Sequence, residues 1–245
     1  MNPAPFWRAV LDFFFPAKCP LCGLSPDSST PDRPCSGCLS QVKFFSSPRC
    51  LRCGIGFPSS SEVDHLCAEC LSEERHFSLA RAVCGYEGVI MEAISRLKYG
   101  GLTRLAKPLG NLLAEYQDPD FELAENDWVI PVPLHTRRLR ERGFNQSLLL
   151  ARQVSRRRSI PLNFTALRRA RQTQPQTQLS GAERRKNVRG AFEVKKREAV
   201  KGKRILLIDD VFTTGATVQE CAYVLREAGA TEVHVLTLAR VGWGY

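Results

Sequence analysis

The chain has 245 residues, of which 43% are hydrophobic and 24% are charged; these values are close to the globular average and argue against a disordered chain, a collagen and a coiled coil. The length suits one large domain, or a medium domain plus a small one. The net charge of +10 is regional, because residues 135–204 carry 21 basic and 4 acidic residues, a net +17. Such a region usually binds phosphate groups.

The N-terminal segment is apolar but short. Arg8 and Asp12 interrupt it and no small-residue cleavage site follows, so we interpret residues 1–16 as an amphipathic lead helix that docks on the core, not as a signal peptide. No apolar run approaches the roughly 20 residues that cross a bilayer. We therefore expect no membrane insertion and a cytoplasmic location.

Residues 17–78 are rich in cysteine and poor in apolar runs, and we expect them to form a small domain. Eight of the ten cysteines fall here as four C-x-x-C pairs. A reducing compartment argues against disulfides. Two such pairs complete a tetrahedral site, so eight thiolates suit two structural zinc ions, which would supply the folding energy that a small core lacks. The predicted ligands are Cys19, Cys22, Cys35 and Cys38 for one ion, and Cys50, Cys53, Cys67 and Cys70 for the other.

Other interpretations of the cysteines remain open at this point. The pairs could interleave, and iron–sulfur ligation is an alternative to zinc. Thioredoxin-like redox chemistry needs a single C-x-x-C at a helix start, which four pairs in series do not resemble. His65 could replace a thiolate. Cys84 and Cys221 lie outside the pattern, and we expect them to be buried apolar residues.

Residues 79–245 have the pattern of an α/β domain. Strands alternate with helices, which predicts a parallel sheet flanked by helices on both sides. A polar stretch is typical of a mobile loop, and Ser180 to Glu183 fits a capping box at the start of a short basic helix. The predicted strands are 81–86, 128–130, 190–195, 203–209 and 232–239, the helices are 88–98, 104–116, 146–158 and 217–228, and the loop is 168–179.

The segment from Ile205 to Thr217 combines a buried strand, two carboxylates and a Thr-Thr-Gly turn that enters a helix. Ligands of open α/β sheets bind at the carboxyl ends of the strands. Carboxylates accept hydrogen bonds from a sugar's vicinal hydroxyls, and the free N–H groups of a helix start suit a phosphate. The residue types therefore fit a ribose 5-phosphate. A capped helix with two turn-forming aspartates is the alternative, but a cap needs only one such residue. Neither the P-loop nor the dinucleotide-binding glycine motif is present.

This segment closely resembles the phosphoribosyl diphosphate (PRPP) motif of type I phosphoribosyltransferases. The resemblance implies that Asp209 and Asp210 hold the ribose hydroxyls as the catalytic pair. It also implies that the turn binds the 5-phosphate through Thr213, Thr214, Gly215, Ala216 and Thr217.

Further motifs narrow the resemblance to the ComF family, which includes the GntX-like proteins. They are Lys98 to Gly101, Pro131 to Leu134, Arg140 to Gln146, the residues Thr173, Gln176, Leu179, Arg184 and Asn187, and Gly190 to Phe192. Together with the cysteine segment, the resemblance covers nearly the whole chain. It implies a type I phosphoribosyltransferase fold over residues 79–245 behind a double zinc ribbon over residues 17–78.

The basic region follows the predicted strand 128–130. In phosphoribosyltransferases the loop at this place binds pyrophosphate, which implies that role for Pro133 and Leu134. Guanidinium groups bind phosphate oxygens in bidentate fashion, and a flexible loop can exclude water on closing. A solvated basic surface is the alternative. The candidate pyrophosphate and loop residues are Arg137, Arg138, Arg140, Arg142, Arg184, Lys186 and Asn187.

The sequence leaves two functional classes open. One is a magnesium-dependent phosphoribosyltransferase with an unidentified acceptor, and no residue stands out as its general base. The other is a non-catalytic module that senses PRPP or nucleotides, or that handles single-stranded DNA. The net +17 exceeds the charge of one PRPP–magnesium complex, so a longer polyanion such as single-stranded DNA is expected to bind. The resemblance agrees, since ComF proteins are associated with DNA uptake in natural competence, which implies the uptake machinery as a partner.

Overall fold

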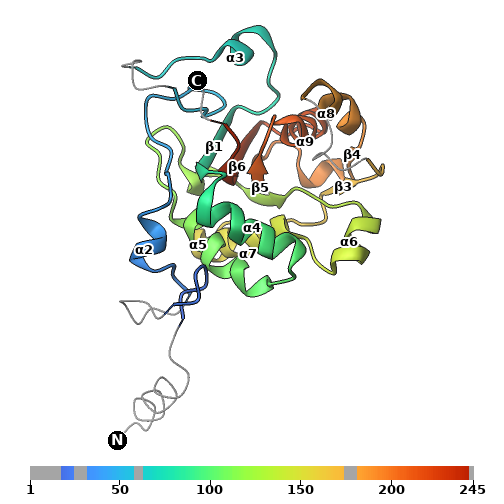
Figure 1. Cartoon of the computed structure of the whole chain (residues 1–245). Coiled ribbons are helices and arrows are strands. Elements are labelled where there is room, and N and C mark those ends of the chain that lie inside the picture. The colour runs from blue at the N-terminus through green and yellow to red at the C-terminus, as the bar shows by residue number, and fades with distance from the viewer. Residues whose placement is uncertain (1–17, 25–31, 58–62, 174–180, 243–245) are drawn as a thin grey trace, which may run out of the picture.

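The computed structural model describes residues 18–24, 32–57, 63–173 and 181–242. At the centre of this part of the chain lies a four-stranded parallel sheet with the strand order β1-β6-β5-β2 (Figure 1). Its strands are β1 (Leu79–Gly85), β2 (Trp128–Pro131), β5 (Arg204–Phe212) and β6 (Glu232–Arg240). The predicted parallel sheet is thereby confirmed.

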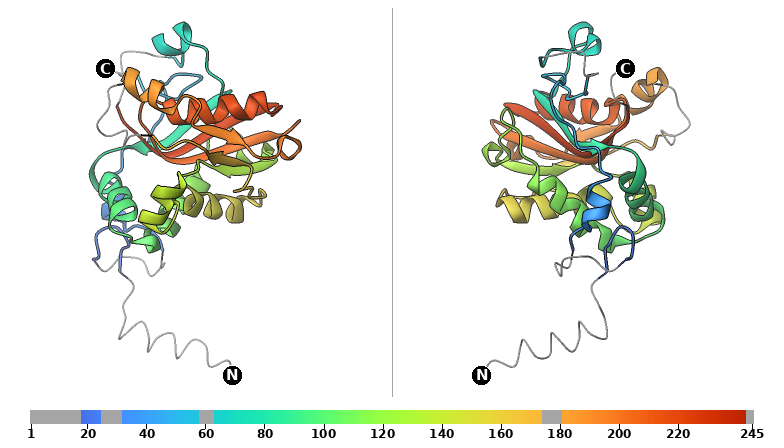
Figure 2. Two further views of the ribbon diagram at one scale, coloured as in Figure 1. Left: turned by 90° about the vertical axis from the view of Figure 1, so that its right-hand side faces the viewer. Right: turned by 60° about the vertical axis from the view of Figure 1, so that its left-hand side comes forward.

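Helices cover both faces of the sheet, as the alternation of strands and helices predicts (Figure 2). Successive side chains of a strand point to opposite faces. In β5, Leu206 and Ile208 accordingly face one apolar cluster, whereas Ile205 and Leu207 face the other. The first cluster is covered by α4 (Gly88–Tyr99), α5 (Ala106–Glu115) and α7 (Gln146–Arg158), and the second by α9 (Ala216–Glu227).

Three parts of the chain differ from prediction. Leu167–Arg169 forms β3 and pairs antiparallel with β4 (Phe192–Val194), outside the main sheet. The predicted mobile loop 168–179 thus begins inside a strand, because a second strand is within reach to complete its hydrogen bonds. Thr136–Arg142 forms the helix α6, and β5 continues past Asp209 to Phe212.

The remaining described helices are short. They are α2 (Ser36–Leu39), α3 (Ala68–Ser72), α8 (Gly181–Val188) and the 3₁₀ turns η1 (Thr103–Leu105), η2 (Leu123–Glu125) and η4 (Arg197–Ala199). The predicted lead helix 1–16 and the Ser180 cap lie outside the described residues. None of the described helices has the length and apolar character that a membrane crossing demands.

The cysteine segment packs against both faces of the sheet. Cys19 and Cys38 belong to the apolar cluster with α4, α5 and α7, whereas Cys50 and Cys53 belong to the cluster with α9. Between them, residues 43–45 run antiparallel to β1: the Phe45 N–H donates to the Val83 carbonyl (3.2 Å) and the Gly85 N–H to the Lys43 carbonyl (2.9 Å). The outer edge of β1 is therefore hydrogen-bonded to the cysteine segment.

Candidate functional site

A cavity of about 690 Å³ lies at the carboxyl ends of β2 and β5. Parallel strands deliver their C-terminal residues to one edge of a sheet, which is where α/β folds bind ligands. The cavity gathers residues from α4, α6, α7, β3 and β5. Its lining includes Lys98, Tyr99, Pro133, Leu134, Arg137, Arg138, Arg142, Ser147, Arg169, Asp209, Asp210, Thr213, Gly215 and Thr217.

Both predicted carboxylates line this cavity, and both are engaged. The Ser147 hydroxyl donates to Asp209 Oδ1 at 2.7 Å, and the Lys98 ammonium lies 2.7 Å from Asp210 Oδ2. Asp209 is 8% exposed and Asp210 3%, so each presents only a small surface to the cavity. A ligand that binds Asp210 shares this carboxylate with Lys98.

Burial sets the electrostatics of this acidic pair. It raises the pKa of Asp209 to about 7, and the neighbouring Asp210 charge acts in the same direction, while the Ser147 hydrogen bond acts against both. Burial lowers the pKa of Lys98, but the attraction of Asp210 outweighs this, so its pKa lies above the ordinary lysine value. Lys98 is thus a stable ammonium that compensates the acidic pair.

The Thr–Gly turn, residues 213–217, connects β5 to α9 beside the carboxylates. Gly215 is the N-cap of α9 with φ of 75°, a left-handed conformation that favours glycine. A side chain there would also collide with the Phe212 ring, because a Cβ would lie 2.5 Å from its Cζ. Thr213, Gly215 and Thr217 line the cavity, whereas the Thr214 hydroxyl accepts from the Ala216 N–H (3.4 Å). The start of α9 therefore offers backbone N–H groups to an anion.

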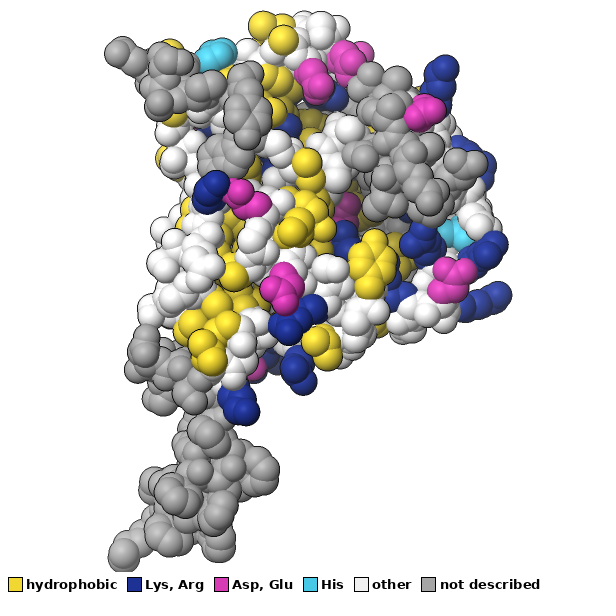
Figure 3. Space-filling view, in the orientation of Figure 1, with side chains coloured by type: hydrophobic (Ala, Val, Ile, Leu, Met, Phe, Trp, Pro, Cys, Tyr) yellow, Lys and Arg dark blue, Asp and Glu magenta, His cyan; other side chains and the backbone are white. Residues whose placement is uncertain are grey.

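The opposite wall of the cavity is basic. Pro133 and Leu134 lead into α6, whose side chains in the cavity lining are Arg137, Arg138, Glu141 and Arg142. Lys and Arg side chains gather over α6, at the right of Figure 3. The Arg142 guanidinium lies 5.5 Å from the centroid of the Tyr99 ring and donates to Gln146 (2.5 Å), while Arg137 pairs with Glu141 (2.9 Å). We call Arg137, Arg138 and Arg142 the basic wall.

Not every predicted residue reaches this cavity. Arg140, Lys186 and Asn187 are outside the lining that the described residues form, and the Arg184 side chain is not among the described parts. Arg169 of β3 lines the cavity instead. Lys186 and Asn187 lie on α8, which packs beside α9, and their contact with a ligand stays a prediction.

Sequence reasoning missed four contributors. Lys98 and Tyr99 belong to the motif Lys98 to Gly101, to which no role is assigned from the sequence. Their position at the end of a predicted helix is the feature that could have drawn attention to them. Ser147 lies in the first turn of α7, two residues after the N-cap Asn145, whose side chain accepts from the Ser147 and Leu148 N–H groups. Arg169 had no signal, because its strand is short and polar.

The eight paired cysteines form two tetrads, which we call the first tetrad (Cys19, Cys22, Cys35, Cys38) and the second tetrad (Cys50, Cys53, Cys67, Cys70). In each, the ligand atoms lie within 4.8 Å of one another. The sequence-ordered grouping is found, and the interleaved one is not. His65 stands apart from both sets, stacked on the Phe57 ring.

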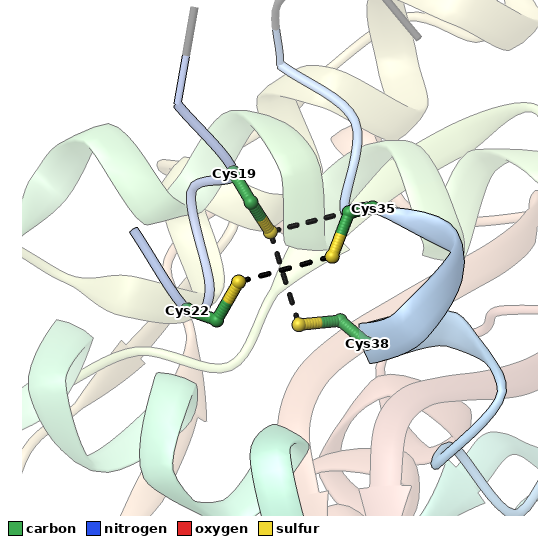
Figure 4. A group of neighbouring side chains, drawn as sticks. All are labelled: Cys19, Cys22, Cys35 and Cys38. Atoms are coloured by element: carbon green, nitrogen blue, oxygen red, sulfur yellow. Dashed lines mark hydrogen bonds between the residues drawn. The ribbon is translucent and has the colours of Figure 1, made fainter. Parts of the chain in front are cut away.

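The tetrad geometry fits zinc. Four sulfurs at about 2.3 Å from an ion form a tetrahedron with edges of about 3.8 Å. The Sγ atoms of Cys19 and Cys38 are 3.8 Å apart, as are those of Cys22 and Cys35, and all four point to a common centre (Figure 4). In the second tetrad, the Cys53 and Cys67 sulfurs are 3.7 Å apart. These separations are too long for disulfides and right for a shared Zn²⁺.

Backbone N–H groups support the sulfurs. The Cys35 N–H donates to Cys19 Sγ (3.3 Å), and the Cys53 and Cys67 N–H groups both donate to Cys50 Sγ (3.4 and 3.3 Å). Such bonds favour a thiolate over a thiol. Cys84 and Cys221 are fully buried, as predicted.

Family comparisons cover most of the chain. Residues 10–71 match the double zinc ribbon domain, and residues 145–245 match the phosphoribosyl transferase domain. Competence protein F of Haemophilus influenzae is 34% identical over 212 residues, which is 84% of this chain and 90% of that protein. DNA utilization protein YhgH of Escherichia coli K12 is 35% identical over 64% of this chain and 70% of that protein. Competence protein ComFC of Bacillus subtilis is 32% identical over 65% of this chain and 63% of that protein.

Solved structures give weaker likenesses. A glutamine PRPP amidotransferase from B. subtilis, complexed with ADP and GMP, is 32% identical with a TM-score of 0.36, over 53% of this chain and 25% of that one. Orotate phosphoribosyltransferase from Aeropyrum pernix is 25% identical with a TM-score of 0.36, over 59% of this chain and 64% of that one. Because competence protein F matches 84% of this chain and 90% of its own length, and two domain models match residues 10–71 and 145–245, the chain belongs to the ComF family of competence and DNA-utilization proteins.

Proposed function

We propose that the cavity binds PRPP. One observation carries the proposal: the acidic pair and the Thr–Gly turn are consecutive in the chain and line a cavity whose other wall is basic. Asp209 and Asp210 accept from the ribose hydroxyls, the turn holds the 5-phosphate, and the basic wall faces the pyrophosphate. Magnesium accompanies the pyrophosphate, whose charge it reduces.

Lys98 shares Asp210 with the proposed ligand. Its ammonium contacts Oδ2, and a carboxylate has lone pairs on both oxygens that can accept from ribose hydroxyls while this ion pair stays in place. Lys98 therefore compensates the charge of the carboxylate with or without ligand.

Any transfer reaction would proceed by substitution at C1 of the ribose. A lone pair of the acceptor forms the new bond to C1, the C1–O bond breaks, and pyrophosphate leaves with the electron pair. The acceptor's proton passes to solvent or to the leaving group. Positioning and charge compensation are what this chain's residues supply.

Calorimetry with PRPP, with and without Mg²⁺, tests the proposal. We expect binding that strengthens with Mg²⁺ and that Asp210→Asn weakens about tenfold or more, since a charge-assisted bond contributes on the order of 1.5–3 kcal/mol. The control is Asp127→Asn, whose carboxylate pairs with Lys203 (3.2 Å) at the far end of β5. No binding by the wild-type protein, or equal binding by both variants, would overturn the assignment. Pyrophosphate release with candidate acceptors separates a transferase from a non-catalytic module.

A second surface supports a role with single-stranded DNA. A groove of about 580 Å³ runs between η1, α5 and α7, and its cations are Arg104, Lys107, Arg152 and Arg156. Lys107 pairs with Asp32 (2.5 Å). The other three are exposed and have no ion-pair partner among the described residues. Unpaired arginines in a groove suit the phosphates of a nucleic-acid backbone, and one relative is named a DNA utilization protein. We propose that this groove carries the DNA contact.

A further inference from the structure

The second tetrad is connected to the Thr–Gly turn by a buried arginine. Arg240 ends β6 and is 5% exposed. Its Nη1 donates to the Cys53 carbonyl at 2.7 Å, and its Nη2 lies 3.7 Å from the Cys53 sulfur. Four thiolates around one Zn²⁺ carry a net charge of −2, so the loaded site compensates this buried guanidinium. Arg240 therefore depends on the second tetrad for hydrogen-bonding and charge partners.

Arg240 also contacts Phe212, the residue before the turn. Its guanidinium lies 4.2 Å from the centroid of the Phe212 ring, a cation–π contact in a buried setting. The outer edge of the same ring lies against Gly215, so closely that a Cβ there would lie 2.5 Å from Cζ. Phe212 thus transmits the position of Arg240 to the backbone of the turn.

A second connection reaches α9 independently. Gln219, in the first turn of α9, accepts from the His76 N–H (3.2 Å) and donates to the Glu74 carbonyl (2.9 Å). Glu74 follows α3, the helix that carries Cys70. The segment that leaves the second tetrad is therefore bonded to the same helix start whose N–H groups face the cavity.

The first tetrad offers a contrast. Its cysteines pack on the other face of the sheet, and the Leu21 carbonyl next to them accepts from Arg96 of α4 (2.9 Å). No described residue of the first tetrad contacts the Thr–Gly turn. Each tetrad consists of four cysteines, but the two tetrads contact different parts of the fold.

We propose that the second tetrad, acting through Arg240 and Phe212 and through Gln219, positions the Thr–Gly turn and so sets the affinity for a sugar 5-phosphate. Arg240 is a positioning residue in this scheme, since it does not line the cavity. The inference rests on the proposed function of the turn. It predicts that loss of the metal from the second tetrad weakens phosphate binding, whereas loss of the metal from the first tetrad does not.

Calorimetry with two probes and three variants tests this proposal. Ribose 5-phosphate reports on the turn, and inorganic pyrophosphate reports on the basic wall. Cys67→Ser disrupts the second tetrad, Cys22→Ser is the matched change in the first, and Arg240→Met keeps both tetrads intact. We expect Cys67→Ser and Arg240→Met to weaken ribose 5-phosphate about tenfold, a usual coupling between sites, with pyrophosphate within about twofold of wild type. Cys22→Ser should leave both affinities unchanged.

The outcomes separate the two proposals. A wild-type protein that binds neither probe contradicts the proposed function itself. A wild type that binds ribose 5-phosphate, with Arg240→Met equal to it, overturns only the coupling. Equal weakening by Cys22→Ser and Cys67→Ser also overturns it, because the effect is then general loss of structure. Elemental analysis should find two zinc ions in Arg240→Met, which shows that both tetrads stay loaded in this variant.

Discussion

Lys98 and Asp210 form a buried ion pair across 112 positions of sequence, with the ammonium 2.7 Å from Oδ2 and side-chain exposures of 17% and 5%. Breaking such a pair by removing one partner leaves a buried charge without compensation. The acidic pair on β5 therefore depends on a residue of α4, and the stability of the fold and the ligand affinity of the cavity are linked.

Removing Lys98 should destabilise the fold. We expect Lys98→Met to lower the free energy of unfolding by about 3 kcal/mol, because Asp210 remains buried without a partner. Adding Asp210→Asn should recover most of that loss. Urea denaturation of both single variants and the double variant measures the coupling. The control is Lys107→Met, whose pair with Asp32 is exposed and should contribute less than about 1 kcal/mol. A loss at Lys98 no larger than at Lys107 contradicts the buried pair.

The raised pKa of Asp209 predicts a pH-dependent stability. Its ordinary value is 3.8 and its pKa in the fold is about 7, so between pH 4 and 7 the folded state holds a proton that the unfolded state has lost. The contribution of Asp209 is therefore present at low pH and declines as the pH rises to 7, by on the order of 4 kcal/mol. Asp209→Asn, which keeps an oxygen for Ser147, should gain stability relative to wild type as the pH goes from 5 to 8. A gap between the two proteins that is constant over this range argues against the shift.

The Thr–Gly turn should not tolerate a side chain at Gly215. A comparison of two glycines separates the backbone effect from the steric effect. Gly215 has φ of 75° and lies against the Phe212 ring, whereas Gly143 has φ of 81° and open space around it. Gly143→Ala should cost about 1–2 kcal/mol for the left-handed backbone alone. Gly215→Ala should cost more than that, since the ring must also move. Thermal unfolding of the two variants gives the difference, and similar losses would show that the contact with Phe212 is unimportant.

DNA binding should depend on the arginines of the groove and not on their neighbours. Arg156 lies in the groove, whereas Arg158 donates to the Ala114 and Tyr116 carbonyls and Arg157 pairs with Glu115 (3.0 Å). We expect Arg156→Glu to weaken single-stranded DNA binding and to reduce its salt dependence, since one fewer phosphate is neutralised. Fluorescence anisotropy at several salt concentrations measures both. Arg197→Glu, on η4 and outside the groove, is the charge-matched control; equal losses would point to overall charge alone.

Local patterns predicted much of this molecule. The bounds of α7 agree with the expected helix 146–158, because its apolar face repeats at helical spacing. The tetrads followed from ligand spacing, and the buried strand β5 from an unbroken apolar run. Each of these signals lies within a short stretch of sequence.

The unpredicted parts depend on distant residues. Ser147 meets Asp209 across 62 positions, and Arg169 reaches the cavity only because β3 pairs with β4. The helix α6 contains a single large apolar residue, Leu139, which is exposed, so it has no apolar periodicity to read. Tertiary contacts select these features, and a single sequence has no local signal for them.

The antiparallel contact of residues 43–45 with β1 bears on how the protein can be divided. Without it, β1 would present a row of unsatisfied backbone groups, which is a template for pairing with a second chain. A fragment that starts at the sheet should therefore self-associate through this strand, and the cysteine segment serves the rest of the chain as a guard against aggregation.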